Sequence, residues 1–150
     1  MMAEKKTRQK WKVWVITGLS AALLTACALF PDDAGTIALN WGIELPGGYT
    51  VAYETDSGAS FGGDGRRCHV FTWQDGSALE DLLPWSEDDE AGLALAEEIL
   101  TALDVPEEGR PDLSACLIWH GNIREVDPRD QLVILYLPAS ACLWVLESFV

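Results

Sequence analysis

Three apolar segments close to the C-terminus predict β-strands. Residues 131–137 are apolar at almost every position, which is typical of a central strand that is buried on both faces. Residues 113–120 and 141–149 lie on either side of this segment in the sequence. Only Pro138-Ala139-Ser140 separates the last two segments, which leaves room for a tight antiparallel turn. The pattern therefore predicts antiparallel strands at the end of the chain.

In the middle of the chain, apolar residues recur at the spacing of an α-helix. The apolar stripe consists of Leu93, Ala96, Ile99, Leu100 and Leu103. We expect Ser86 to cap this helix and the acidic residues 87–90 to fill its first turn, where the helix dipole favours negative charge. Val105 precedes a proline and therefore avoids the helical conformation. These features predict a main helix over about 87–104.

Alternating apolar and polar residues predict two strands in the first half of the chain. The first, over 49–55, is expected to place Tyr49, Val51, Tyr53 and Thr55 on one face. The second, over 68–73, is expected to place His69, Phe71 and Trp73 on one face. A long glycine-rich connection separates the two strands.

Two shorter segments complete the predicted fold. Residues 36–45 are interpreted as a further strand, which Pro46 and two glycines stop. Ser77 and Glu80 form a capping-box pattern for a short helix that ends before Pro84. The order of strands and helices predicts an α+β fold, in which an antiparallel sheet of about five strands has the main helix packed on one face.

The N-terminus has the pattern of an export signal. Basic residues precede an apolar run over 13–26, which is shorter than the about 20 residues that span a bilayer. Leu24-Thr25-Ala26-Cys27 closes this run and resembles the lipobox of bacterial lipoproteins. The resemblance implies that the Cys27 thiol receives a diacylglyceryl group and that the signal is removed before it. The alternatives are an ordinary signal or a membrane anchor in which Cys27 is incidental.

This interpretation divides the chain into a signal peptide over 1–26, a tether over 27–36 and a single domain over 37–150. Pro31 and Gly35 interrupt regular structure in the predicted tether. The lipoprotein resemblance implies an extracytoplasmic location on the cell membrane or outer membrane. The expected partner is the lipid bilayer, through acylated Cys27.

Charge is distributed unevenly along the chain. Residues 1–26 hold five of the ten basic residues and one of the 24 acidic residues, so residues 27–150 hold five basic and 23 acidic residues, a formal net charge of −18. Such an acidic body repels nucleic acid, which we therefore exclude as a partner. The sequence does not identify a protein partner or a small ligand, and no motif indicates a cofactor.

The glycine-rich connection is the most unusual part of the predicted domain. Gly62, Gly63 and Gly65 would place backbone N–H groups around an anion, with Arg66 at the rim. Alternatively, Asp56 and Asp64 would bind calcium, although their spacing is not that of an EF-hand. The third interpretation is a simple hairpin connection, which the strand on each side favours.

Ser60-Phe61-Gly62-Gly63-Asp64-Gly65 also carries a family resemblance. With its flanking strands it is similar to the N-terminal strand pair of an uncharacterised group of small exported bacterial proteins, which carry Gly-Gly-Phe-His-Gly-Asp-Gly. The resemblance covers roughly a sixth of the chain, and Gly62 stands where the group has histidine. It implies an exported α+β domain without a particular activity. If that histidine is catalytic or binds a metal in the group, its replacement by Gly62 argues against the same role in this chain.

His69 and His120 are the two histidines of the chain. His69 lies in a predicted strand and is interpreted as a core or edge residue, whereas His120 ends a strand, a better position for function. No H-E-x-x-H or C-x-x-C motif occurs. We therefore favour a binding or accessory module. The alternative is a cation-dependent or hydrolytic enzyme that uses the Asp64 loop and His120.

Three cysteines follow Cys27: Cys68, Cys116 and Cys142. An exported setting allows one disulfide among them, with three pairings. In a simple meander Cys116 and Cys142 lie two strands apart, at roughly 9.6 Å, which is too far for a disulfide. Pairing of Cys68 with either partner stays open, and three buried apolar thiols are the favoured alternative.

Overall fold

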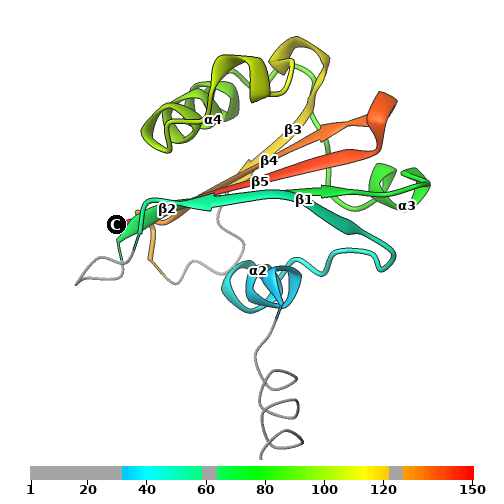
Figure 1. Ribbon diagram of the computed structural model, residues 1–150, viewed down its shortest axis with the longest axis horizontal. Helices are drawn as coiled ribbons and strands as arrows, with labels where there is room; N and C mark the ends of the chain where they lie inside the picture. The colour runs from blue at the N-terminus through cyan, green and yellow to red at the C-terminus, as the bar shows by residue number, and fades with distance from the viewer. Residues whose placement is uncertain (1–31, 59–63, 122–126) are drawn as a thin grey trace, which may run out of the picture. The chain divides into compact units, whose positions relative to one another are not determined.

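The computed structural model describes residues 32–58, 64–121 and 127–150. It divides the chain into two units, Met1–Thr36 and Ile37–Val150. The second unit contains a five-stranded sheet in the order β1-β2-β5-β4-β3, in which every neighbouring pair is antiparallel (Figure 1). The strands are β1 (Thr50–Asp56), β2 (Gly65–Thr72), β3 (Leu117–Gly121), β4 (Gln131–Leu137) and β5 (Cys142–Phe149). The predicted α+β class and five-stranded antiparallel sheet are therefore confirmed.

The described helices are α2 (Asp33–Trp41), α3 (Ser77–Glu80) and α4 (Glu90–Ala102). Short 3₁₀ turns occur at Glu107–Gly109, Leu113–Ala115 and Pro138–Ser140. Among these described elements, none is a helix that is long and apolar enough to cross a membrane.

The C-terminal strands form the predicted meander. β4 lies between β3 and β5, and its residues 132–136 are buried on both faces. The turn at Pro138–Ser140 ends in the left-handed residue Ala141, with φ of 47°, and returns the chain to β5. β5 then pairs with β2 along its whole length, which joins the β1–β2 hairpin to the meander.

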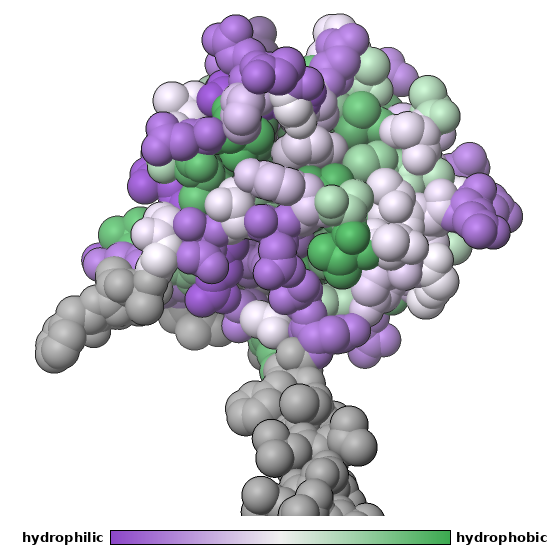
Figure 2. Space-filling model, viewed as in Figure 1, coloured by the Kyte–Doolittle hydropathy of each residue, from purple (hydrophilic) through white to green (hydrophobic). Residues whose placement is uncertain are grey.

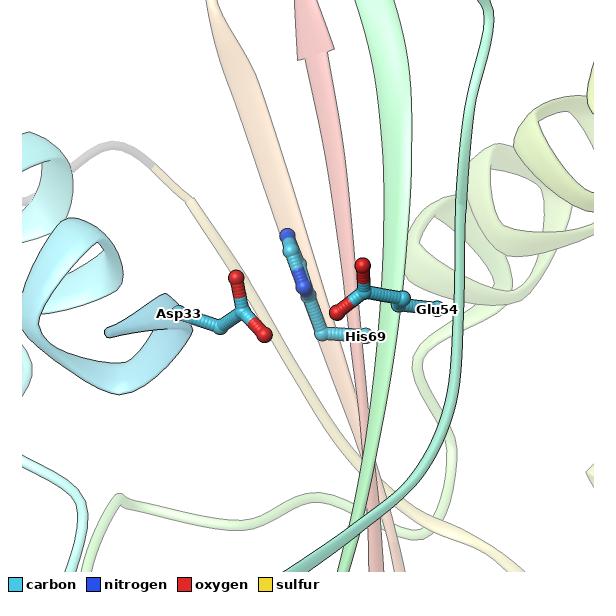
Figure 3. A group of neighbouring side chains, drawn as sticks. All are labelled: Asp33, Glu54 and His69. Carbon is cyan, nitrogen blue, oxygen red and sulfur yellow. The ribbon is translucent and has the colours of Figure 1, made fainter. Parts of the chain in front are cut away.

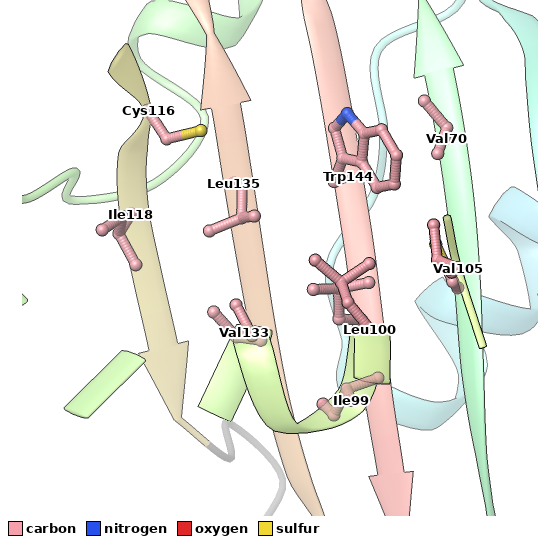
Figure 4. Packing of buried hydrophobic residues seen from close by; sticks show 12 residues of the cluster. Val70, Ile99, Leu100, Val105, Cys116, Ile118, Val133, Leu135 and Trp144 are labelled. Atoms are coloured by element: carbon pink, nitrogen blue, oxygen red, sulfur yellow. The ribbon is translucent and has the colours of Figure 1, made fainter. Parts of the chain in front are cut away.

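Helix α4 covers one face of the sheet (Figure 1). Side chains of α4 and of all strands except β1 form the core on this face, shown in Figure 4. The fully buried members include Ile99, Leu100, Ile118 and Val133. The outward side of the helix carries exposed acidic residues, and hydrophilic side chains gather over it in Figure 2. Apolar burial, at about 25 cal/mol per Å², is therefore what fixes α4 on the sheet.

The two predicted helix caps are wrong. Asp89, and not Ser86, caps α4, because its Oδ1 accepts a hydrogen bond from Gly92 N at 2.9 Å. Ser86 instead pairs with Ile118 of β3 through two backbone hydrogen bonds of 2.8 Å. At α3, Ser77 is the first helical residue, and no side chain caps the helix at the preceding glycine. Both serines lie where another backbone or side-chain contact takes precedence over the local capping preference.

The strand predicted over residues 36–45 is also wrong, because helix α2 occupies most of it. Within the second unit, Ile37 and Trp41 are buried one helical turn apart. In the first unit, Asp32 Oδ1 accepts a hydrogen bond from Gly35 N at 2.8 Å, a typical N-terminal cap. The helix therefore includes residues 33–36, the end of the predicted tether.

A β-bulge changes the faces of β1. Val51 is paired with Phe71 of β2, but after the bulge Tyr53 is paired with Val70. Paired residues share a face, so Val51 and Tyr53 lie on opposite faces and the predicted common face of β1 is wrong. The bulge also places Glu54 opposite His69, on the face that α4 does not cover.

Candidate functional site

A glutamate is buried inside β5, on the face opposite α4. Glu147 is fully buried, and its Oε1 accepts a hydrogen bond of 2.5 Å from the indole Nε1 of Trp41. Its other oxygen, Oε2, lies 3.4 Å from Nε2 of His69 on the neighbouring strand β2. A carboxylate and an imidazole are therefore held side by side in the interior of the second unit.

His69 is unusual among buried histidines because its hydrogen-bonding capacity is unused. Only 9% of its surface is exposed, yet neither Nδ1 nor Nε2 has a hydrogen-bond partner among the described residues. Glu147 Oε2 likewise has no hydrogen-bond partner there, because its orientation toward His69 is not that of a hydrogen bond. Burying polar atoms without partners costs free energy, so this arrangement requires a physical explanation.

Glu54 completes what we call the His69 cluster, which consists of Trp41, Glu54, His69 and Glu147. Glu54 lies on the exposed strand β1, directly across from His69. A carboxylate oxygen of Glu54 lies within 4.8 Å of a ring nitrogen of His69. Figure 3 shows this carboxylate beside the imidazole. The imidazole thus has one glutamate in the interior and a second at the edge of the sheet.

Aromatic rings fix the position of the cluster. The ring of Phe71 is stacked against the imidazole of His69, with 6.2 Å between the ring centroids. The ring centroids of Trp41 and Phe149 are 5.6 Å apart, and Cζ of Arg67 lies over the phenyl ring, 5.0 Å from its centroid. These contacts limit the rotamers of His69 and Trp41, so the polar atoms are held in place before any ligand arrives.

A second acid–histidine pair lies on the α4 face. His120 Nδ1 contacts Asp89 Oδ2, and 39% of the His120 side chain is exposed. Burial of Asp89 raises its pKa, but the hydrogen bonds from Gly92 and His120 outweigh this effect, so the net pKa is lowered. Asp89 is therefore a partnered helix cap, in contrast to Glu147.

Two of the residues predicted from the glycine-rich connection, Asp56 and Arg66, have partners of their own in the described structure. Gly62 and Gly63 lie outside the described residues, as does the predicted lipidation site Cys27. Asp56 Oδ1 accepts a hydrogen bond from Gly58 N at 2.6 Å. The Arg66 side chain forms an ion pair of 2.7 Å with Glu98 of α4.

Asp64 and His120 are also far apart in the sheet. Asp64 immediately precedes Gly65, the first residue of β2, and β5 and β4 separate β2 from the strand of His120. Three strand spacings correspond to roughly 14 Å. His69 and His120 lie on opposite faces, because His69 is in register with Val145 and Ile134, whereas His120 is in register with Val133. The two histidines therefore belong to different sites.

The three described cysteines are free thiols: Cys68 and Cys116 belong to the core on the α4 face, and Cys142 packs against it. Burial raises the pKa of Cys68 to about 12 and that of Cys116 to about 11, and it also raises the pKa of Cys142. Cys116 precedes β3, and Cys142 begins β5, so β4 lies between them as expected. At these pKa values the thiols are protonated at neutral pH and therefore weak nucleophiles.

Comparison of the chain with protein-family models, with curated proteins and with solved structures gives no match. The function is therefore inferred from the residues of this chain alone.

The sequence interpretation missed Trp41, Glu54 and Glu147 as partners of His69. One signal was present: Glu147 is the single charged residue in the apolar segment 141–149. A charge in a strand that is otherwise buried on both faces is rare unless it is paired. The partners themselves depend on the β2–β5 pairing and on the bulge in β1, which no local pattern reveals.

Proposed function

We propose that the protein is an extracytoplasmic lipoprotein, anchored through Cys27, whose folded domain serves as a binding or accessory module. The observation that carries the proposal is the N-terminal sequence, in which a basic segment, a short apolar run and Leu24-Thr25-Ala26-Cys27 occur in the order of a lipoprotein signal. The weak resemblance of residues 49–73 to small exported bacterial proteins points in the same direction.

Acylation supplies a physical basis for stable anchoring. Each buried CH₂ group contributes about 0.8 kcal/mol, so two or three acyl chains hold a protein far more firmly than one. Removal of residues 1–26 leaves a strongly acidic chain, which anionic lipid headgroups repel. Attachment would therefore depend on the acyl chains rather than on the protein surface.

The second hypothesis was an enzyme that combines the Asp64 loop with His120. That chemistry needs the two groups within hydrogen-bond reach of one substrate. Asp64 directly precedes β2 and His120 lies on β3, and the two strands between β2 and β3 do not favour such an arrangement. The His69 cluster, by contrast, supports a binding role, because His69 and Glu147 keep polar atoms that have no hydrogen-bond partner among the described residues.

The anchor is tested by labelling cells with radioactive palmitate. The wild-type chain should incorporate the label and sediment with membranes, whereas Cys27→Ala should do neither. Cys142→Ala is the matched control, because Cys142 is a free, partly exposed thiol of the folded domain. Equal labelling of the wild-type and Cys27→Ala chains would refute the proposal.

A further inference from the structure

We propose that His69 and Glu54 bind a divalent transition-metal ion such as Zn²⁺, and that Glu147 orients the imidazole for this purpose. The inference does not depend on the lipid anchor. It begins with His69, a side chain that is nine-tenths buried and whose ring nitrogens have no hydrogen-bond partner in the part of the chain that the structure describes. The lone pair of a neutral imidazole nitrogen is a common ligand of transition-metal ions, so a metal ion is a ligand that would use such a nitrogen.

The ligand atoms are close enough to share an ion. A ring nitrogen of His69 and a carboxylate oxygen of Glu54 lie within 4.8 Å of one another. Zinc binds imidazole nitrogen and carboxylate oxygen at about 2.0–2.2 Å, so a small side-chain movement of Glu54 brings both into coordination. Glu54 can make this movement because it lies on an exposed edge strand.

Glu147 occupies the position of the outer carboxylate found beside many metal-binding histidines. Its Oε2 lies 3.4 Å from Nε2 of His69, on the interior side of the ring. The two atoms are not in hydrogen-bond geometry, but the negative charge of a carboxylate this close to Nε2 favours the tautomer with a proton on Nε2, which leaves the lone pair of Nδ1 for the metal. The Trp41 indole holds the other oxygen of Glu147 at 2.5 Å and thereby fixes the carboxylate.

The burial of the cluster explains why these residues differ from ordinary surface acids. Glu147 is fully buried and His69 is open to solvent over 9% of its surface, whereas Glu54 is exposed. An ion would therefore enter from the edge formed by β1 and meet His69 from that side. Imidazole selects transition metals over Mg²⁺ and Ca²⁺, which prefer oxygen ligands, so the site should discriminate against the commoner cations.

Isothermal titration of the full-length chain in detergent with Zn²⁺ tests the proposal. Excess Mg²⁺ is present throughout, so that it occupies the general acidic surface. We expect saturable binding by the wild type and none by His69→Gln. Glu54→Gln should also bind more weakly, and because this residue is exposed its replacement leaves the fold intact. Glu147→Gln should reduce the affinity about tenfold or more, as for other outer carboxylates.

His120→Gln is the matched control, since it makes the same substitution at the histidine of the other face and should bind Zn²⁺ as the wild type does. Circular dichroism of each variant confirms that it is folded. Saturable binding that persists in both His69→Gln and Glu54→Gln would overturn the proposal, as would a wild-type chain that binds no Zn²⁺ in the presence of Mg²⁺. Loss of binding in His120→Gln alone would assign the metal to the Asp89 pair instead.

Discussion

The acid–histidine pairs on the two faces of the sheet differ in burial and in hydrogen bonding. On the α4 face the interior is apolar, and the pair formed by Asp89 and His120 lies at the partly exposed rim. On the other face the pair formed by Glu147 and His69 lies in the interior, and it keeps polar atoms without hydrogen bonds among the described residues. One pair closes a helix end, whereas the other has unused binding capacity.

This difference separates a stabilising role from a functional one. The rim pair contributes to stability, because the hydrogen bonds that Asp89 accepts outweigh its partial desolvation. A buried pair loses most of its solvation, and its attraction rarely compensates fully for that loss. A buried pair that costs folding free energy is better explained by a ligand than by folding, which is why the His69 cluster is the stronger candidate site.

The largest expected change in the free energy of unfolding tests whether apolar burial holds α4 on the sheet. Leu100→Ala removes a fully buried side chain from the core under α4 and should lower the free energy of unfolding by about 3 kcal/mol. Leu39→Ala in α2 is the control, because 60% of that leucine is exposed, and it should change stability by less than about 0.5 kcal/mol. Urea unfolding measures both, and equal effects would contradict the assignment of the core.

A smaller loss of stability is expected on the face opposite α4, where Trp41 and Glu147 form a buried hydrogen bond. Glu147→Leu leaves the buried indole N–H of Trp41 without its acceptor and should cost about 2 kcal/mol. The double variant Trp41→Phe/Glu147→Leu removes both partners, so much of this loss should be recovered. If urea unfolding shows the two changes to be additive, the hydrogen bond is not what Glu147 contributes to the fold.

Local sequence patterns predicted the elements whose signals are local. The segment 131–137 became β4 without change, and the apolar stripe around Leu100 became the buried side of α4. The segment 36–45 was misassigned because six of its residues, 36–41, are helical and form fewer than two helical turns, too short for the helical period to stand out against Pro46 and its glycines. The prediction of helix caps failed where a tertiary contact, such as the pairing of Ser86 with Ile118, competed with the capping preference of the residue.

The candidate site was harder to predict than the fold. His69 and Phe71 share a face as expected, but the partners of His69 come from a bulge in β1, a helix and the last strand. Pairing of β2 with β5 joins residues nearly 80 positions apart, such as His69 and Val145, and depends on the whole chain. The sequence around Glu147 thus holds a local signal, a single charge in an apolar strand, but no signal for what this residue contacts.

The smallest effect concerns the rim pair and its dependence on pH. Asp89→Ala removes the cap of α4 and should lower the free energy of unfolding by about 1 kcal/mol at neutral pH. Because folding lowers the pKa of Asp89, its contribution is complete above the ordinary value of 3.8 and is lost as the pH falls through the folded value. The difference in stability between the wild type and Asp89→Ala should therefore shrink as the pH is lowered below about 4. Asp88→Ala is the control, because the exposed neighbour Asp88 does not cap the helix. Urea unfolding at several pH values measures both differences, and a gap for Asp89→Ala that stayed constant down to acidic pH would show that its charge is not what stabilises the helix end.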